Sequence, residues 1–183
     1  LRQNTTGISN IGIGYLALLT NTIGHSNVSL GRETLRLNTT GCQNVAIGAF
    51  ALCKNTTGIN SVAIGLRALE CNTTGQTNVA VGTCTLRSNT NGCFNVAVGF
   101  QSLLDNTTGF DNVALGYQAL KENTTGRFNI GIGTQAGLSN TTGSANIAMG
   151  QCAFRAAETG SSNVVIGHQA MLAGEGTIEN NVV

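Results

Sequence analysis

Apolar and polar residues follow one short pattern along the whole chain. A 17-residue unit repeats ten times without a gap from Asn4 to Ala173, with the consensus N-T-T-G-x-x-N-V-A-I-G-x-x-A-L-x-x. Counted from the first Asn, columns eight and ten hold Val, Ile, Leu or Met, and column nine holds a small residue in every repeat except at Val165. Alternation with a period of two predicts a β-strand. We expect its large residues to face the core and its small residues to form an outer stripe.

Column fifteen adds a third apolar position, which is Leu in most repeats and is often preceded by Ala. This stretch predicts a second short strand or an extended return arm. Columns four and eleven are Gly in every repeat, which indicates positive φ or a close approach of another segment. A fixed period of this length is the signature of a solenoid, so we predict an all-β fold, a parallel β-solenoid (β-roll) of ten coils about 48 Å long.

The repeat boundaries divide the chain into three parts. Residues 1–3 match the end of a preceding repeat, residues 4–173 are the ten solenoid repeats, and residues 174–183 match the start of a further, irregular repeat. We therefore expect a segment of a longer fibre. Each coil offers only about three large side chains to its interior, and we expect self-association through the small column-nine stripe to compensate for the thin core.

Charge and hydropathy exclude two classes of partner. Nine basic and eight acidic residues give a net charge of +1, which provides no electrostatic footprint for nucleic acid. No apolar run approaches the roughly 20 residues of a membrane-spanning helix, and no signal peptide is recognisable. We expect no nucleic-acid partner and no membrane insertion.

Asn dominates columns one and seven, with Ala157 and Ser61 as the respective exceptions. Stacked amides can bond from coil to coil, and we predict two structural ladders. Many of these residues also form N-glycosylation sequons. The sequons begin at Asn4, Asn27, Asn38, Asn55, Asn72, Asn106, Asn123 and Asn140. Glycans about 5 Å apart would crowd one another, so turn chemistry is favoured, while glycosylation of some coils stays open.

Catalytic chemistry is weakly represented. His25 and His168 lie at opposite ends of the predicted rod, and the best carboxylate pair, Asp105 and Glu122 in column seventeen of adjacent coils, is expected to be two solvated corner residues. We predict no enzyme, no catalytic residue, no metal site and no cofactor.

The cysteine spacing also argues against a disulfide framework. Of the six cysteines, only Cys53 and Cys71 fall close enough to pair, and we expect isolated thiols.

Five aromatic residues interrupt the pattern in three successive coils. They occupy the variable columns five, six and twelve, and they are Phe94, Phe100, Phe110, Tyr117 and Phe128. They are the candidate partner-binding residues, for a cell-surface glycan or a protein receptor. The alternative is that they pack across a subunit interface.

The N-V-A-I-G core followed by x-x-A-L resembles the head repeats of trimeric autotransporter adhesins, whose left-handed β-rolls associate as homotrimers. The longer unit, with N-T-T-G, is similar to repeat tracts of bacteriophage and large-virus tail fibres and of bacterial surface proteins. The resemblance runs from Asn4 to Ala173. It implies a trimeric, extracellular or virion fibre that presents or forms an attachment region.

Two other functions remain open. One is ice binding through the Thr ladder of column two, and the other is a carbohydrate-binding or carbohydrate-cleaving tailspike. The absence of Trp and of a carboxylate-rich groove weighs against the tailspike.

Overall fold

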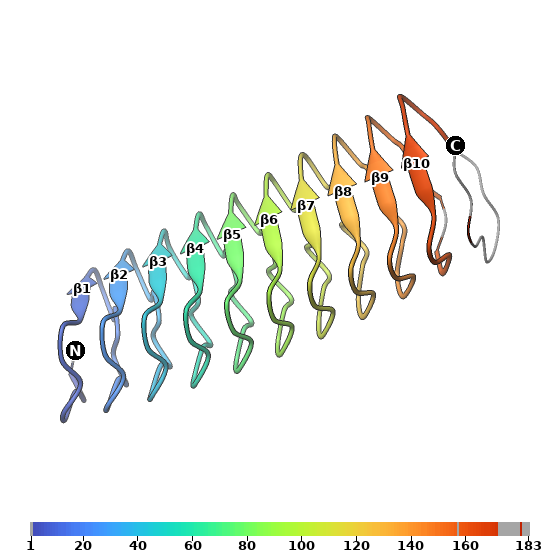
Figure 1. The fold of residues 1–183 in the computed structure, drawn as a ribbon. Helices are drawn as coiled ribbons and strands as arrows, with labels where there is room; N and C mark the ends of the chain where they lie inside the picture. Colours follow the sequence, from blue (N-terminus) through green and yellow to red (C-terminus); the bar gives the residue numbers. More distant parts are fainter. Residues whose placement is uncertain (1, 157, 172–179, 181–183) are drawn as a thin grey trace.

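The computed structural model is a rod of stacked coils (Figure 1). It describes residues 2–156, 158–171 and 180. Each repeat contributes one three-residue strand. The strands are β1 (Ile11–Ile13), β2 (Val28–Leu30), β3 (Val45–Ile47), β4 (Val62–Ile64), β5 (Val79–Val81), β6 (Val96–Val98), β7 (Val113–Leu115), β8 (Ile130–Ile132), β9 (Ile147–Met149) and β10 (Val164–Ile166). They form a single parallel sheet in chain order, and the described residues contain no helix.

This architecture confirms the all-β parallel solenoid. Every strand pairs with the next at an offset of one repeat, so that Val45 lies opposite Val62 and Val62 opposite Val79. The backbone ladder continues outside the strands, for example from Leu52 N–H to Ala68 O at 3.0 Å. The irregular repeat predicted at residues 174–183 lies outside the described residues, apart from Asn180.

The interior is built from the small column-nine residues, so the predicted orientation of the strands is wrong. Ala46, Ala63 and Ala80 are fully buried, whereas the flanking large side chains reach the surface, with Leu30 43% and Ile64 37% exposed. The predicted outer stripe of small residues therefore does not exist. Self-association through such a stripe is ruled out with it.

Leu side chains from column fifteen explain this orientation. The leucines from Leu18 to Leu120 are buried, as predicted, and they fill the space opposite the strand. A Cβ added to Gly131 in column nine would lie only 2.7 Å from Leu120 Cγ of the preceding coil. Because Leu already occupies the narrow interior, only a small residue fits across from it.

The return arm, columns twelve to seventeen, forms turns rather than a second strand. Its residues in columns thirteen and fifteen adopt left-handed backbone conformations, with φ of 57° at Arg67 and 52° at Leu69. These conformations are uncommon for side chains with a Cβ. The intercoil hydrogen bonds stabilise them, such as Leu69 N–H to Thr85 O at 3.0 Å.

Glycine is required for different physical reasons in columns four and eleven. Gly82 in column eleven has φ of 134°, a region that favours glycine. Gly75 in column four is required by space, because an added Cβ would lie 2.4 Å from both Asn72 Oδ1 and Gly92 O.

Candidate functional site: the outward strand face

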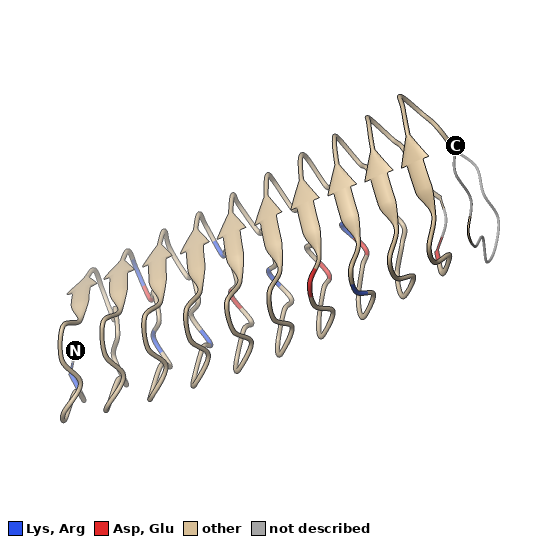
Figure 2. Ribbon diagram, viewed as in Figure 1, with Lys and Arg blue, Asp and Glu red and all other residues tan. Residues whose placement is uncertain are grey.

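An apolar face runs along the rod. We define the strand face as the side chains of columns eight and ten in β1 to β10. Its most exposed large members are Ile11, Ile13, Leu30, Ile64, Val98, Met149 and Ile166. None of the three-residue strands contains Lys, Arg, Asp or Glu, and the strands in Figure 2 are therefore tan, the colour of all other residues. A continuous apolar surface of this kind marks an interaction site.

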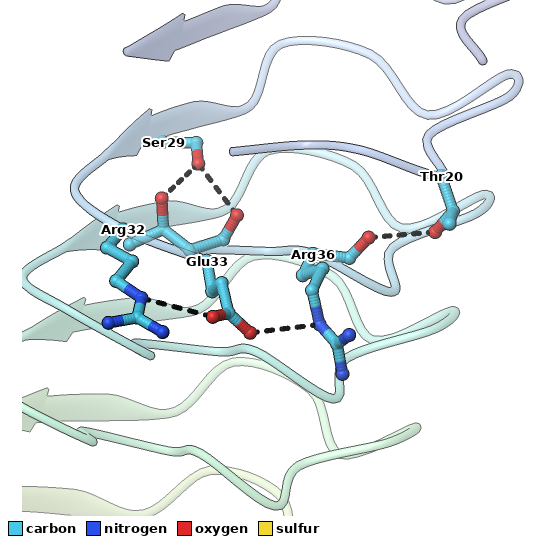
Figure 3. A network of polar contacts seen from close by, with 6 residues as sticks. Thr20, Ser29, Arg32, Glu33 and Arg36 are labelled. Atoms are coloured by element: carbon cyan, nitrogen blue, oxygen red, sulfur yellow. Dashed lines mark hydrogen bonds and ion pairs between the residues drawn. The ribbon is translucent and has the colours of Figure 1, made fainter. Parts of the chain in front are cut away.

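In coils two to five the charged residues all lie on the return arm, away from the strand face. Figure 3 shows the Glu33 carboxylate between two guanidinium groups, 3.2 Å from Arg32 Nε and 3.4 Å from Arg36 Nε. The Thr20 hydroxyl donates to the Arg36 carbonyl oxygen at 2.9 Å in the same view. The single Glu33 carboxylate therefore pairs with both arginines, while Arg36 Nε makes no hydrogen bond.

Two further basic residues on the arm are also engaged. Arg67 lies over the Phe50 ring at 5.8 Å from its centroid. Arg87 Nε donates to Glu70 Oε2 at 3.0 Å, and this hydrogen bond raises the pKa of Arg87. The arm of coils two to five carries five basic and two acidic residues, and its two carboxylates pair with three of the five basic side chains.

The five predicted aromatic residues form two groups, not one. Phe100 and Tyr117 follow strands β6 and β7 and stack with ring centroids 5.6 Å apart and planes 8° apart. Phe110 and Phe128 precede β7 and β8 and meet edge to face at 5.3 Å. Phe94 precedes β6 and is exposed. The strands separate the two groups, which therefore border opposite edges of the strand face.

The stacking limits what the aromatic groups can bind. Phe100 and Tyr117 each turn one ring face toward the other, and a sugar needs an open ring face to stack on. Arg127 covers Phe110 at 5.6 Å from its ring centroid. The Phe100–Tyr117 pair therefore leaves each ring only its outward face for a ligand.

The other titratable candidates are the carboxylates Asp105 and Glu122 and the two histidines. Burial raises the pKa of Asp105, Lys121 opposes that shift, and Glu122 adds to it. Within the described residues, no three His, Cys, Asp or Glu side chains are grouped to hold a metal ion. His25 and His168 belong to coils two and ten.

All six cysteines are free, as expected, so Cys53 and Cys71 do not pair. Cys42 shows the role of column five: its thiol donates to Thr40 O at 3.1 Å and accepts from His25 N–H at 3.4 Å. Ser144 takes the same place in its own coil. Cys53 is buried, and burial raises the pKa of its thiol.

The predicted Asn ladders are present. Asn72 Nδ2 donates to Asn55 Oδ1 at 2.8 Å and to Gly75 O at 3.0 Å, and the pattern recurs along column one. In column seven, Asn95 donates to Asn78 Oδ1 through both its backbone N–H and its side chain. These amides are structural.

Column two was the predicted ice-binding rank, and its hydroxyls are already used. Thr56 Oγ1 donates to the Thr73 carbonyl oxygen at 3.0 Å. The Thr73 oxygen also accepts the backbone N–H groups of Thr56, Thr57 and Gly58. The column-three residues, such as Thr57, are exposed but form a single rank. A flat face with two ranks of free Thr hydroxyls is therefore not formed in the described coils.

The outward strand face is the candidate feature that sequence reasoning missed. A signal was available, because columns eight to ten contain no charged residue in any repeat, whereas other columns do. Among the described residues, no helix is long and apolar enough to cross a membrane. No model of a known family, no curated protein and no solved structure matches this chain.

Proposed function

We propose that this chain is a structural fibre segment of an extracellular or virion attachment protein, in which identical rods associate through their strand faces as a homotrimer. The observation that carries the proposal is the strand face itself, which is apolar and uncharged from β1 to β10. Burying such a surface against a partner is favourable by roughly 25 cal/mol per Å² of apolar area.

A second copy of the same chain fits this face best. The V-x-I pair recurs at every coil, so copies aligned along their axes match rung for rung over the full length. A partner with another spacing would match only locally. Most soluble oligomers are also homo-oligomers with closed symmetry. The three-fold number and the attachment role come from the resemblance to adhesin heads and tail fibres.

Absolute mass in solution, by sedimentation equilibrium, tests the association. The chain mass is 18.7 kDa, so we expect three times that value, about 56 kDa. The double variant Ile64→Lys/Val98→Lys places two charges on the strand face and is expected to sediment at the monomer mass. The matched control, Thr57→Lys/Asn91→Lys, changes exposed column-three residues of the same two coils and is expected to stay associated. A monomeric wild-type rod would overturn the proposal.

The attachment role needs its own test. We expect the rod, or the fibre that contains it, to bind a cell-surface glycan or protein receptor, and we expect loss of the exposed Phe94 and Phe128 rings to weaken that binding. Replacing Phe94 and Phe128 by Ser leaves the interior untouched because both rings are exposed. Unchanged binding to host cells by this variant would place the receptor site elsewhere.

A further inference from the structure

The column-one sequons have their acceptor atoms inside the rod. An N-linked glycan attaches to Asn Nδ2 in the pattern N-x-S/T. Six of these asparagines are completely buried in the folded coil. They are Asn38, Asn55, Asn72, Asn106, Asn123 and Asn140. The sequence therefore offers glycan acceptors that the fold conceals.

Each acceptor nitrogen is also fully employed in hydrogen bonding. Asn72 Nδ2 uses its two hydrogens for Asn55 Oδ1 at 2.8 Å and Gly75 O at 3.0 Å. A glycan would replace one of these hydrogens and leave a buried carbonyl oxygen with one donor fewer. An unsatisfied buried acceptor destabilises the fold, before the sugar itself is accommodated.

The space around the amide is smaller than a sugar ring. A single carbon added at Gly75 would lie 2.4 Å from Asn72 Oδ1 and 2.9 Å from Asn89 Nδ2. The coils above and below repeat this arrangement, since Gly58 and Gly92 meet the same contacts. A glycan at Asn72 would therefore separate its coil from both neighbours.

We infer that folding of this rod and N-glycosylation at column one exclude each other. A glycan added to the unfolded chain prevents its coil from stacking, and a folded rod presents no acceptor to the glycosylating enzyme. A chain that meets this enzyme before it folds can therefore fold only if its column-one acceptors escape modification. This inference is independent of the proposed association, because it depends only on contacts inside one chain.

The test uses a chain that retains one acceptor and is directed through the secretory pathway of yeast. Ser29→Ala and Thr→Ala changes in column three remove the other sequons. The threonines changed are Thr6, Thr40, Thr57, Thr108, Thr125 and Thr142. Their exposed hydroxyls make no hydrogen bond in the described part of the chain. Glycosidase-sensitive mobility reports the glycan at Asn72, and limited proteolysis of the same sample reports folding.

We expect every glycosylated molecule to be degraded and every protease-resistant molecule to lack the glycan. Adding Ala80→Asp buries a charge in the interior and keeps the chain unfolded, so it should raise glycan occupancy at Asn72. A molecule that is both glycosylated and resistant overturns the inference. Equal occupancy with and without Ala80→Asp overturns it as well.

The matched control places a glycan on the surface of the same rod. Cys93→Ser makes exposed Asn91 an acceptor, and Ser occupies column five at Ser144, where its hydroxyl accepts Arg127 N–H and donates to Thr142 O. Thr74→Ala removes the Asn72 acceptor from this variant. We expect glycosylated molecules of this variant to resist protease. Loss of resistance here would mean that any glycan disrupts the rod, and burial of column one would not be the cause.

Discussion

In β2 to β9 the small residue faces the interior and the larger residues face outward, which is the reverse of most half-buried strands. The inner side of β5 presents Ala80, which is fully buried, while its outer side presents Val79 and Val81, which remain partly accessible. In the usual half-buried strand the large residues face the core. The difference teaches that this interior is already filled by Leu from the return arm. The larger side chains of the strand therefore remain at the surface.

Among the variants that test this difference between the two sides, removal of an interior leucine should reduce stability the most. Leu69→Ala deletes a fully buried side chain and is expected to lower the free energy of unfolding by about 2–5 kcal/mol. Leu66→Ala, in the same coil but 46% exposed, should change it by less than about 0.5 kcal/mol. Urea unfolding followed by circular dichroism measures both. Similar losses in the two variants would contradict the assignment of Leu69 to the core.

Enlarging the two sides of one strand tests the orientation directly. Ala80→Ile forces extra atoms against the column-fifteen leucines and should destabilise the rod by about 1–3 kcal/mol. Val81→Ile adds a methylene on the outer side, where there is room, and should leave the urea midpoint nearly unchanged. If Ala80→Ile were the tolerated change, the strand would face the other way.

The difference between interior and surface can also be measured as the alkylation rate of the cysteines. Cys53 is buried and its pKa is raised by that burial, so its reactive thiolate is scarce in the folded rod. Cys42 and Cys93 are half-buried in column five. We expect iodoacetamide to label Cys53 much more slowly than these two thiols, and urea to remove the difference. Mass spectrometry of the labelled peptides measures the rates.

The smallest expected effect concerns Asp105 at the corner of the return arm. Burial raises its pKa in the folded chain above the ordinary value of 3.8, so the folded state holds the proton more tightly than the unfolded state. Stability is therefore highest below the ordinary pKa, falls as pH rises through the raised pKa, and is constant above it. Asp105→Asn should be slightly more stable than wild type at pH 7.

The pH series supplies the check on that prediction. The stability gap between Asp105→Asn and wild type should close as the pH is lowered below the ordinary pKa of the carboxyl group. A gap that does not change between pH 3 and pH 7 would show that the Asp105 charge is not what separates the two proteins. Urea midpoints at each pH provide the measurement.

Local features of the fold followed from the sequence with few errors. The period located each strand within the coil, and the offset of one repeat set every strand pairing. The Asn ladders and the buried leucines were also predictable, because identical residues in a parallel stack must lie one above another. The free cysteines followed from their separation in coils.

The candidate site was less predictable. The aromatic residues of three coils were expected to form one cluster, but the intervening strands divide them between two edges. Phe94 and Phe100 illustrate this, since they lie on either side of the five-residue segment that contains β6. Neighbourhood along the chain is a poor guide to neighbourhood on a coil, because a three-residue strand already spans roughly 10 Å.

The sequence by itself determined the coil length, the register, the strand positions and the residues that stack. Only the tertiary structure decided which side of the strand is inside. A period-two alternation is symmetric with respect to the two faces of a strand, so the pattern V-A-I does not state its own direction. The deciding facts are a narrow interior and a return arm whose left-handed backbone, with φ near 50° at Leu52 and Leu86, turns each Leu inward. Contacts between coils stabilise that conformation, and the residue type alone does not predict it.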